Sequence, residues 1–328
     1  PYDPNKDSNA LYKAMHGGIT GWGTDESALF KALEGKSPEQ IDKLKANYKD
    51  HYGKDLTADL KKELSGKDLQ RAEALMKGNQ SAADATAIQQ SVGTLWNDNK
   101  QIQQTLTGKT AEQRKDIAEE YKKQTGKELK TELTKEMSGA DRDQAVALLD
   151  GNTAKADAAK LQKAVKGMGT DEAAIMSTLQ GKSAEERAAI EKAYKETYKV
   201  DLKTRLKGDL DGSELDQANA LLDGNQAKAD AAGIKTASSG FFGADKKGIN
   251  EGLEGKTAEE RKAISEAYQQ TYGKELNAEL KSKLSGNDLQ KSQALLERGK
   301  LSEAEQLKFA LEGAGTDEEA VKKALEGK

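Results

Sequence analysis

The sequence contains no cysteine among its 328 residues, and it has only 3 prolines and 2 histidines. Without cysteine there can be no disulfide framework, no thiolate zinc site and no cysteine nucleophile. The two histidines, His16 and His51, do not stand at a spacing typical of metal-binding or catalytic motifs. The sequence therefore indicates a protein that is not an enzyme.

Long apolar runs and an excess of one charge are also missing. No stretch approaches the ~18 apolar residues that a membrane-spanning helix needs, so the chain can meet a membrane only from outside. The 52 basic and 56 acidic residues are interspersed and leave a net charge of −4. Because nucleic-acid binding needs a basic face, we expect no nucleic-acid partner.

What remains is a composition suited to short helices. Alanine, leucine, lysine and glutamate are abundant, and 31 glycines are available to end helices. Charged residues make up 33% of the chain and aromatic residues only 5%, which predicts thin cores. We expect an all-α fold.

An internal repeat organises the chain. A Leu-x-Gly-Lys phrase recurs with its glycine at positions 35, 108, 181, 255 and 327, so the spacing is 72 to 74 residues. Because the chain opens at Pro1 and stops inside a fifth repeat, we expect a segment of a longer protein whose other domains are its partners. The expected divisions are a leader at 1–8, full repeats at 9–79, 80–152, 153–225 and 226–299, and a truncated fifth repeat at 300–328.

Each repeat carries the same helix signals. A capping box follows the glycine in all four repeats, beginning at Ser37, Thr110, Ser183 and Thr257. Apolar residues then recur in steps of four, as in Leu56, Leu60 and Leu64, which gives each helix one buried stripe. This pattern predicts about five helices of 8 to 16 residues in each repeat.

The loop before the second helix of a repeat has a distinctive sequence. Residues 21–26 read Gly-Trp-Gly-Thr-Asp-Glu and residues 167–172 read Gly-Met-Gly-Thr-Asp-Glu. Thr24 and Asp25 are suited to capping the next helix, but capping does not explain two glycines. Glycines let a backbone turn with its carbonyls outward, and such oxygens suit calcium. Forty residues after the second glycine stand Glu63 and Asp209, each able to supply the carboxylate.

In these repeats, loops and acidic residues the sequence resembles the annexins. The resemblance implies a curved disc of four repeats whose convex face binds Ca²⁺ and docks on an acidic phospholipid membrane surface as a peripheral protein. It also implies two sets of calcium ligands. The carbonyl ligands would be Ile19, Gly21 and Gly23 in the first repeat and Val165, Gly167 and Gly169 in the third, with Glu63 and Asp209 as bidentate carboxylates.

Two repeats depart from the ligand pattern. The second has residues 94–98, Thr-Leu-Trp-Asn-Asp, where the glycines should stand, although Glu136 keeps the acidic position. The fourth keeps Gly243 but has Lys283 in place of the acid, and its ammonium would repel a cation. We expect both sites to be inactive.

Two interpretations of the loops stay open. Large apolar residues, Trp22 and Met168, stand between the paired glycines, where they can either enter the lipid interface or fold back onto their own helix. More broadly, the chain is either a calcium-dependent membrane-binding module or a helical repeat scaffold for protein interaction with vestigial calcium loops. The sequence favours the first.

Overall fold

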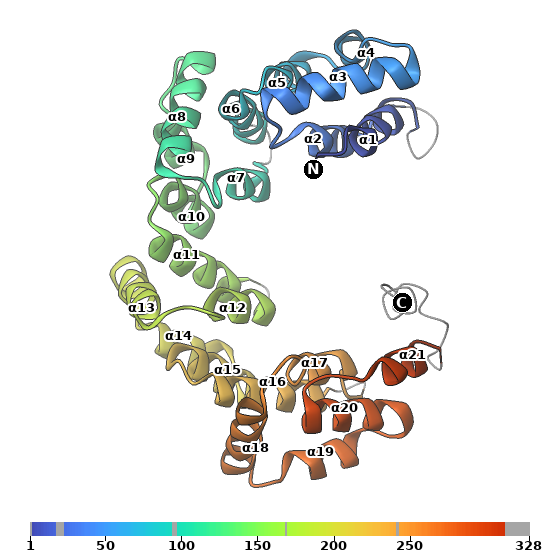
Figure 1. Ribbon diagram of the computed structural model, residues 1–328. Coiled ribbons are helices and arrows are strands. Elements are labelled where there is room, and N and C mark those ends of the chain that lie inside the picture. The colour runs from blue at the N-terminus through green and yellow to red at the C-terminus, as the bar shows by residue number, and fades with distance from the viewer. Residues whose placement is uncertain (1, 18–22, 94–96, 168, 241–242, 312–328) are drawn as a thin grey trace. The chain divides into compact units, whose positions relative to one another are not determined.

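A computed structural model describes residues 2–17, 23–93, 97–167, 169–240 and 243–311 (Figure 1). All regular elements in these ranges are α-helices, and no strand occurs among them, which confirms the all-α prediction. None of the described helices combines the length and the apolar character needed to cross a membrane.

The helices fall into four groups of five, one for each expected repeat, and a further helix follows. The first group is α1 (Pro4–His16), α2 (Glu26–Leu33), α3 (Pro38–Tyr52), α4 (Leu56–Glu63) and α5 (Gly66–Met76). The second is α6 (Gln80–Ser91), α7 (Asn99–Leu106), α8 (Ala111–Thr125), α9 (Leu129–Glu136) and α10 (Gly139–Leu149). The third is α11 (Thr153–Lys166), α12 (Glu172–Leu179), α13 (Ala184–Tyr198), α14 (Leu202–Asp209) and α15 (Gly212–Leu222). The fourth is α16 (Gln226–Ser238), α17 (Lys246–Glu251), α18 (Ala258–Tyr272), α19 (Leu276–Lys283) and α20 (Gly286–Arg298), and α21 (Glu303–Leu311) comes last.

Helix starts follow the sequence signals closely. All four predicted capping boxes are formed, with Gln40, Gln113, Glu186 and Glu260 as the reciprocal partners. Two expectations differ in detail. Helix α17 has six residues, fewer than the predicted minimum of eight, and α1 begins at Pro4, inside the segment assigned to a leader. Asp3 caps α1 and Pro4 pre-sets its first turn, so residues 4–8 of the segment assigned to a leader are helical.

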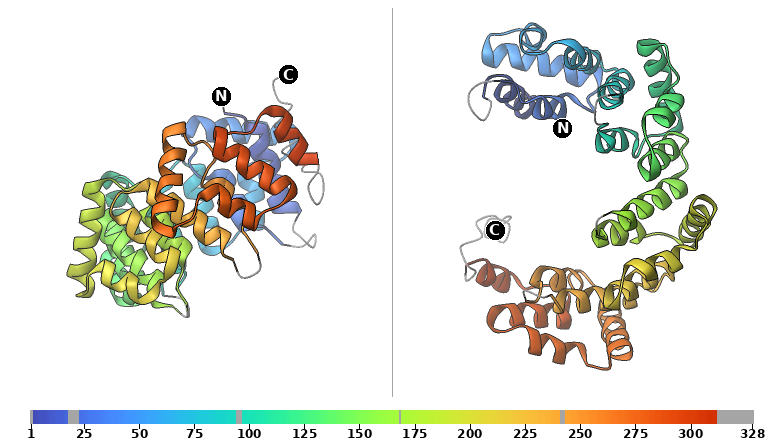
Figure 2. Two further views of the ribbon diagram at one scale, coloured as in Figure 1. Left: turned by 90° about the horizontal axis from the view of Figure 1, so that it is seen from below. Right: turned by 180° about the vertical axis from the view of Figure 1, so that it is seen from behind.

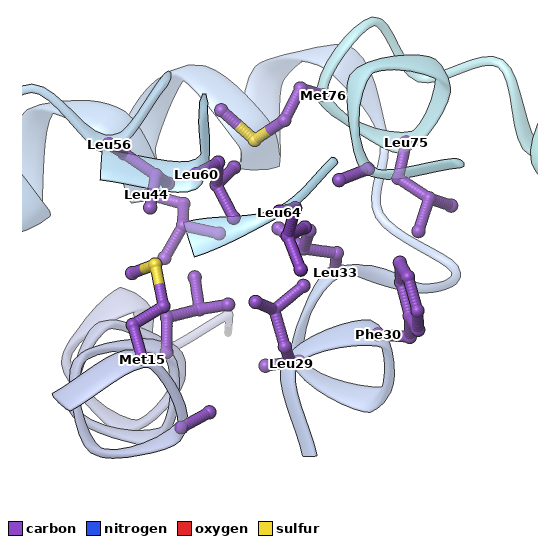
Figure 3. Close-up of a cluster of buried hydrophobic side chains, with 14 of the residues drawn as sticks. Met15, Leu29, Phe30, Leu33, Leu44, Leu56, Leu60, Leu64, Leu75 and Met76 are labelled. Carbon is purple, nitrogen blue, oxygen red and sulfur yellow. The ribbon is translucent and has the colours of Figure 1, made fainter. Parts of the chain in front are cut away.

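The stripes of leucine take part in apolar cores, which form clusters of buried side chains in the first, second and fourth repeats. In the first repeat Leu60 and Leu64 point toward Leu29 and Leu33, as Figure 3 shows. The matching tyrosines of the third helices, Tyr48, Tyr121, Tyr194 and Tyr268, are all buried. Burying a leucine side chain removes it from water at a gain of about 2 kcal/mol, so these small cores hold the short helices together.

The chain divides into two compact units, Pro1–Ala159 and Lys160–Lys328, with the boundary inside α11. Within the second unit, helices α18, α19 and α20 contact one another, and these orange to red helices stay grouped in both views of Figure 2. The first and third repeats, which carry the candidate loops, therefore have their sites in different units.

Candidate metal sites

A backbone hydrogen bond closes the base of the loop in every repeat. The amide of the aspartate that opens the second helix donates to a carbonyl in the last turns of the first helix. The pairs are Asp25 to Ala14 at 2.8 Å, Asp98 to Ser91 at 3.1 Å, Asp171 to Ala164 at 2.9 Å and Asp245 to Ala237 at 2.7 Å. The two ends of each loop are thereby fixed next to each other.

The aspartate, and not the threonine before it, caps the second helix. Asp25 accepts a hydrogen bond from the amide of Ala28 at 2.9 Å, and Asp171 accepts one from Ala174 at the same distance. The expectation that Thr24 caps α2 is therefore wrong. Asp25 already occupies the N-cap position, so the Thr24 side chain is free to bond elsewhere.

The threonine instead ties the loop to the acidic residue forty positions later. The hydroxyl of Thr24 donates to Oε2 of Glu63 at 3.3 Å. In the third repeat the hydroxyl of Thr170 donates to the backbone carbonyl of Asp209 at 3.1 Å. The structure thus brings each predicted carboxylate residue to its own glycine loop, as the spacing predicts.

The second glycine of each loop has a backbone conformation that suits glycine. Gly23 has φ of +92° and Gly169 has φ of +95°, a region that side chains with a Cβ rarely adopt. A Cβ on Gly167 would lie 3.4 Å from the carbonyl oxygen of Gly169. The predicted ligands Ile19 and Gly21 and the predicted membrane residues Trp22 and Met168 lie outside the described residues.

In the third repeat a guanidinium group already contacts two predicted ligand groups. Nη2 of Arg205 donates to the carbonyl oxygen of Val165 at 2.8 Å, and Nε of Arg205 lies 2.9 Å from Oδ2 of Asp209. The second contact is an ion pair without hydrogen-bond geometry, so within the described part of the chain both atoms are buried without a hydrogen-bond partner. The positively charged guanidinium group of Arg205 therefore bridges the Val165 carbonyl and the Asp209 carboxylate.

Electrostatics explain why a cation is stable at this place. Val165 lies in the last turn of α11 and Asp209 is the last residue of α14, so two helix C-termini meet there. Carbonyls at a helix C-terminus lack intrahelical partners and carry partial negative charge. The first repeat has the same arrangement, with α1 ending at His16 and α4 ending at Glu63.

The residue equivalent to Arg205 is acidic in the other three repeats. These residues are Asp59, Glu132 and Glu279, and all three are buried. Burial raises the pKa of Asp59, but hydrogen bonds from Tyr48 and His16 and the nearby Lys54 charge outweigh burial and leave the pKa below its ordinary value. This charge reversal was not among the predictions from the sequence. The signal was present, because Arg205 and Asp209 are four residues apart on one predicted helix.

The loops of the second and fourth repeats are built differently. Asn97 donates from its side-chain amide to the backbone carbonyl of Glu136, and the Glu136 carboxylate pairs with Lys135 at 2.7 Å. In the fourth repeat Gly243 keeps a positive φ of +113°, but Lys283 ends α19 where the acid should stand. Among the described residues, the acid of the second repeat is thus paired with a neighbouring lysine, and the fourth repeat has a lysine in place of the acid.

The donor set decides which ion these loops suit. Among the described residues no cluster of three or more histidine, cysteine, aspartate or glutamate side chains could hold a metal. Each predicted site would instead combine one carboxylate with backbone carbonyls, which are hard oxygen donors suited to Ca²⁺. The Arg205 contacts support this fit, because a positive group already binds both kinds of oxygen.

Comparison with known proteins adds the following similarities. The family model described as Annexin matches residues 7–72, 83–148, 156–214 and 229–291. Human annexin A13 is 34% identical over 252 residues, covering 73% of this chain and 79% of that protein. Rat annexin A6 is 27% identical, covering 94% of this chain and 54% of the relative. Among solved structures, annexin III is 26% identical with a TM-score of 0.31, covering 92% of this chain and 95% of that one.

Proposed function

Since this chain belongs to the annexin family, whose members generally bind phospholipid membranes in a calcium-dependent manner, we propose that it docks on acidic phospholipid through its first and third repeats. The proposed action is non-enzymatic and peripheral. Calcium bridges the loops to lipid phosphates, and no chemical bond is made or broken.

The proposed ligands are those expected from the sequence. Carbonyls of Ile19, Gly21 and Gly23 with the carboxylate of Glu63 would hold one ion. The second ion would be held by carbonyls of Val165, Gly167 and Gly169 with Asp209. The observation that carries the proposal is the pair of threonine contacts, Thr24 to Glu63 and Thr170 to Asp209, which set each acidic residue beside its loop.

Ligand counting explains why lipid is needed. Three carbonyls and one bidentate carboxylate give five oxygens, whereas Ca²⁺ takes about six to eight. Water or a lipid phosphate must complete the shell. With one formal negative charge per site, we expect a dissociation constant on the order of 10⁻⁴ to 10⁻³ M without lipid, as in other low-charge calcium modules.

A membrane strengthens this weak binding. It supplies phosphate ligands and presents them to more than one site of the same chain, which raises avidity by roughly 10² to 10⁴ where the geometry permits. The net charge of −4 gives no attraction to an anionic leaflet without the ion. Binding should therefore require calcium and acidic lipid together.

Vesicle sedimentation tests the proposal directly. The chain is expected to sediment with vesicles of phosphatidylserine and phosphatidylcholine in millimolar calcium. It should stay in the supernatant with a chelator, or with phosphatidylcholine alone. Absence of sedimentation under all three conditions would favour the scaffold interpretation, in which the loops are vestigial.

We expect calcium to occupy only the first and third repeats. The reason is the ligand sets, since the second repeat lacks the glycines and the fourth has Lys283 in place of the acid. A crystal soaked in calcium and measured for anomalous scattering would locate the ions. Ordered ions in the second or fourth repeat, with the first and third empty, would contradict the assignment.

Trp22 is expected to enter the lipid interface when calcium docks its loop. An indole ring partitions well into the boundary between headgroups and acyl chains. The measurement is tryptophan emission in a chain carrying Trp96→Phe, so that Trp22 alone reports. The emission should shift to the blue only when calcium and acidic vesicles are both present.

The competing interpretation of Trp22 predicts a different spectrum. If the side chain packs on its own helix, its emission is already blue-shifted and protected from a soluble quencher without lipid. That result would exclude insertion. A Trp22→Ala variant supplies a second test. Loss of vesicle affinity without a change in melting temperature would assign the residue to the membrane contact.

A further inference from the structure

We propose that Arg205 is a built-in competitor of calcium in the third repeat, so that the ion must displace its guanidinium group to bind. This inference rests on the proposed function and adds a rank order to it. The first repeat binds calcium first, and the third fills only at higher calcium.

Two contacts place the guanidinium in the position of the ion. It donates to the Val165 carbonyl at 2.8 Å and lies 2.9 Å from the Asp209 carboxylate, which are two of the four proposed ligand residues of that site. While these two oxygens contact Arg205, they are weaker ligands for calcium. A second positive charge a few ångströms away would also repel calcium strongly in this half-buried place.

The first repeat provides an internal comparison. Its carboxylate, Glu63, meets the neutral hydroxyl of Thr24 among the described residues, and no arginine or lysine stands one turn before it in the sequence. The residue at that place is Asp59, whose side chain is engaged by Tyr48 and His16. The carboxylate of the first loop is thus available to an ion, and that of the third loop is neutralised.

A second substitution accompanies the charge reversal. Where the position of Arg205 is acidic, a lysine stands five residues earlier and pairs with the acid. The pairs are Lys54 with Asp59 at 3.7 Å, Lys127 with Glu132 at 2.8 Å and Lys274 with Glu279 at 2.6 Å. In the third repeat Val200 replaces the lysine. The third repeat therefore lacks this lysine–acid pair, and the arginine that replaces the acid lies against the calcium loop.

Displacement of Arg205 is sterically feasible. Its side chain is 36% exposed, so the guanidinium can swing toward water when its partners turn to an ion. Arginine stays charged at any accessible pH, so protonation does not release it. Calcium concentration is then the variable that decides which cation occupies the site.

Calcium titration by calorimetry tests the proposal in a chain carrying Glu63→Gln, which leaves the third repeat as the measured site. Adding Arg205→Met is expected to lower the dissociation constant about tenfold. Lys203→Met is the matched control, because Lys203 lies on the same helix and pairs with Asp223 at 2.6 Å, away from the loop. It should leave the constant unchanged.

A calcium-free measurement gives an independent readout. With the tie from Arg205 to Val165 removed, the backbone amides of Gly169 and Thr170 are expected to exchange with deuterium faster. If Arg205→Met lowers the melting temperature, Arg205→Gln carries the same expectation, because it removes the positive charge and is too short to reach the Val165 carbonyl as arginine does, yet keeps a polar side chain.

The outcomes separate this inference from the proposed function. Unchanged or weaker calcium binding in the Arg205 variants would overturn the inference, even if the unmodified chain sediments with vesicles. Failure of the unmodified chain to sediment would overturn the proposed function. In that case a gain of calcium binding in the Arg205 variants would still support a competitor role, and no gain would exclude it.

Discussion

Replacing Glu63 with glutamine and Asp209 with asparagine in one chain is expected to abolish calcium-dependent sedimentation with acidic vesicles. Each amide keeps the size of the side chain but removes the negative charge and the bidentate grip on the ion. Because the two sites contribute jointly to avidity, affinity should fall by at least 10². Sedimentation across a calcium series with phosphatidylserine vesicles measures the loss.

A matched control exists in the second repeat. Glu136 has the same place at the end of the fourth helix of its repeat, but its loop lacks the paired glycines. Glu136→Gln should therefore leave sedimentation unchanged. The melting temperature of the double variant should change little, since Thr170 bonds to the backbone of Asp209, and the amide oxygens introduced at positions 63 and 209 can still accept from Thr24 and Arg205. Full sedimentation of the double variant at millimolar calcium would exclude these carboxylates as the working ligands.

Leu206→Ala is expected to destabilise the second unit by about 3 kcal/mol, in the range found for leucine truncation in well-packed cores. Leu206 is fully buried in α14, between Arg205 and the exposed Lys207. The small core of a five-helix repeat has few other contacts to compensate for a cavity. Urea unfolding followed by circular dichroism measures the change in the free energy of unfolding.

Lys207→Ala provides the neighbouring control. The side chain is exposed, so its removal should change the free energy of unfolding by no more than about 0.5 kcal/mol. Equal losses in the two variants would mean that the leucine stripe does not carry the stability of α14. The same pair of variants also tests the predicted period of four, because only one of two adjacent residues faces the core.

The sequence was sufficient to predict the repeats and most of their helices. Recurring glycines, capping boxes and leucines in steps of four are local signals, and they repeat in register at Gly35, Gly108, Gly181 and Gly255. All four glycines have positive φ, the left-handed backbone conformation that glycine adopts readily. The acidic partners of the loops, Glu63 and Asp209, could also be predicted, because the same forty-residue spacing occurs twice.

Other features depend on contacts between distant segments. That Thr24 turns to Glu63, while Asp25 alone caps α2, is a choice between two competent side chains that spacing does not resolve. The approach of Arg205 to the Val165 carbonyl joins residues forty positions apart through packing of two helix ends. The helical pairing of Arg205 with Asp209 was readable from sequence, but its relation to the loop was not.

The hydrogen bond that closes each loop base has a consequence for how such proteins diversify. Eleven positions separate Asp25 from Ala14, whereas seven separate Asp171 from Ala164, yet both pairs close at nearly the same distance. Closing the longer loop costs only about 0.4 kcal/mol more in chain entropy. Residues inside the loop can therefore be inserted or exchanged without disturbing the helices. Loop length and loop sequence are thus free to vary on a fixed pair of helices, whereas the carboxylate of each proposed site comes from the helical frame itself.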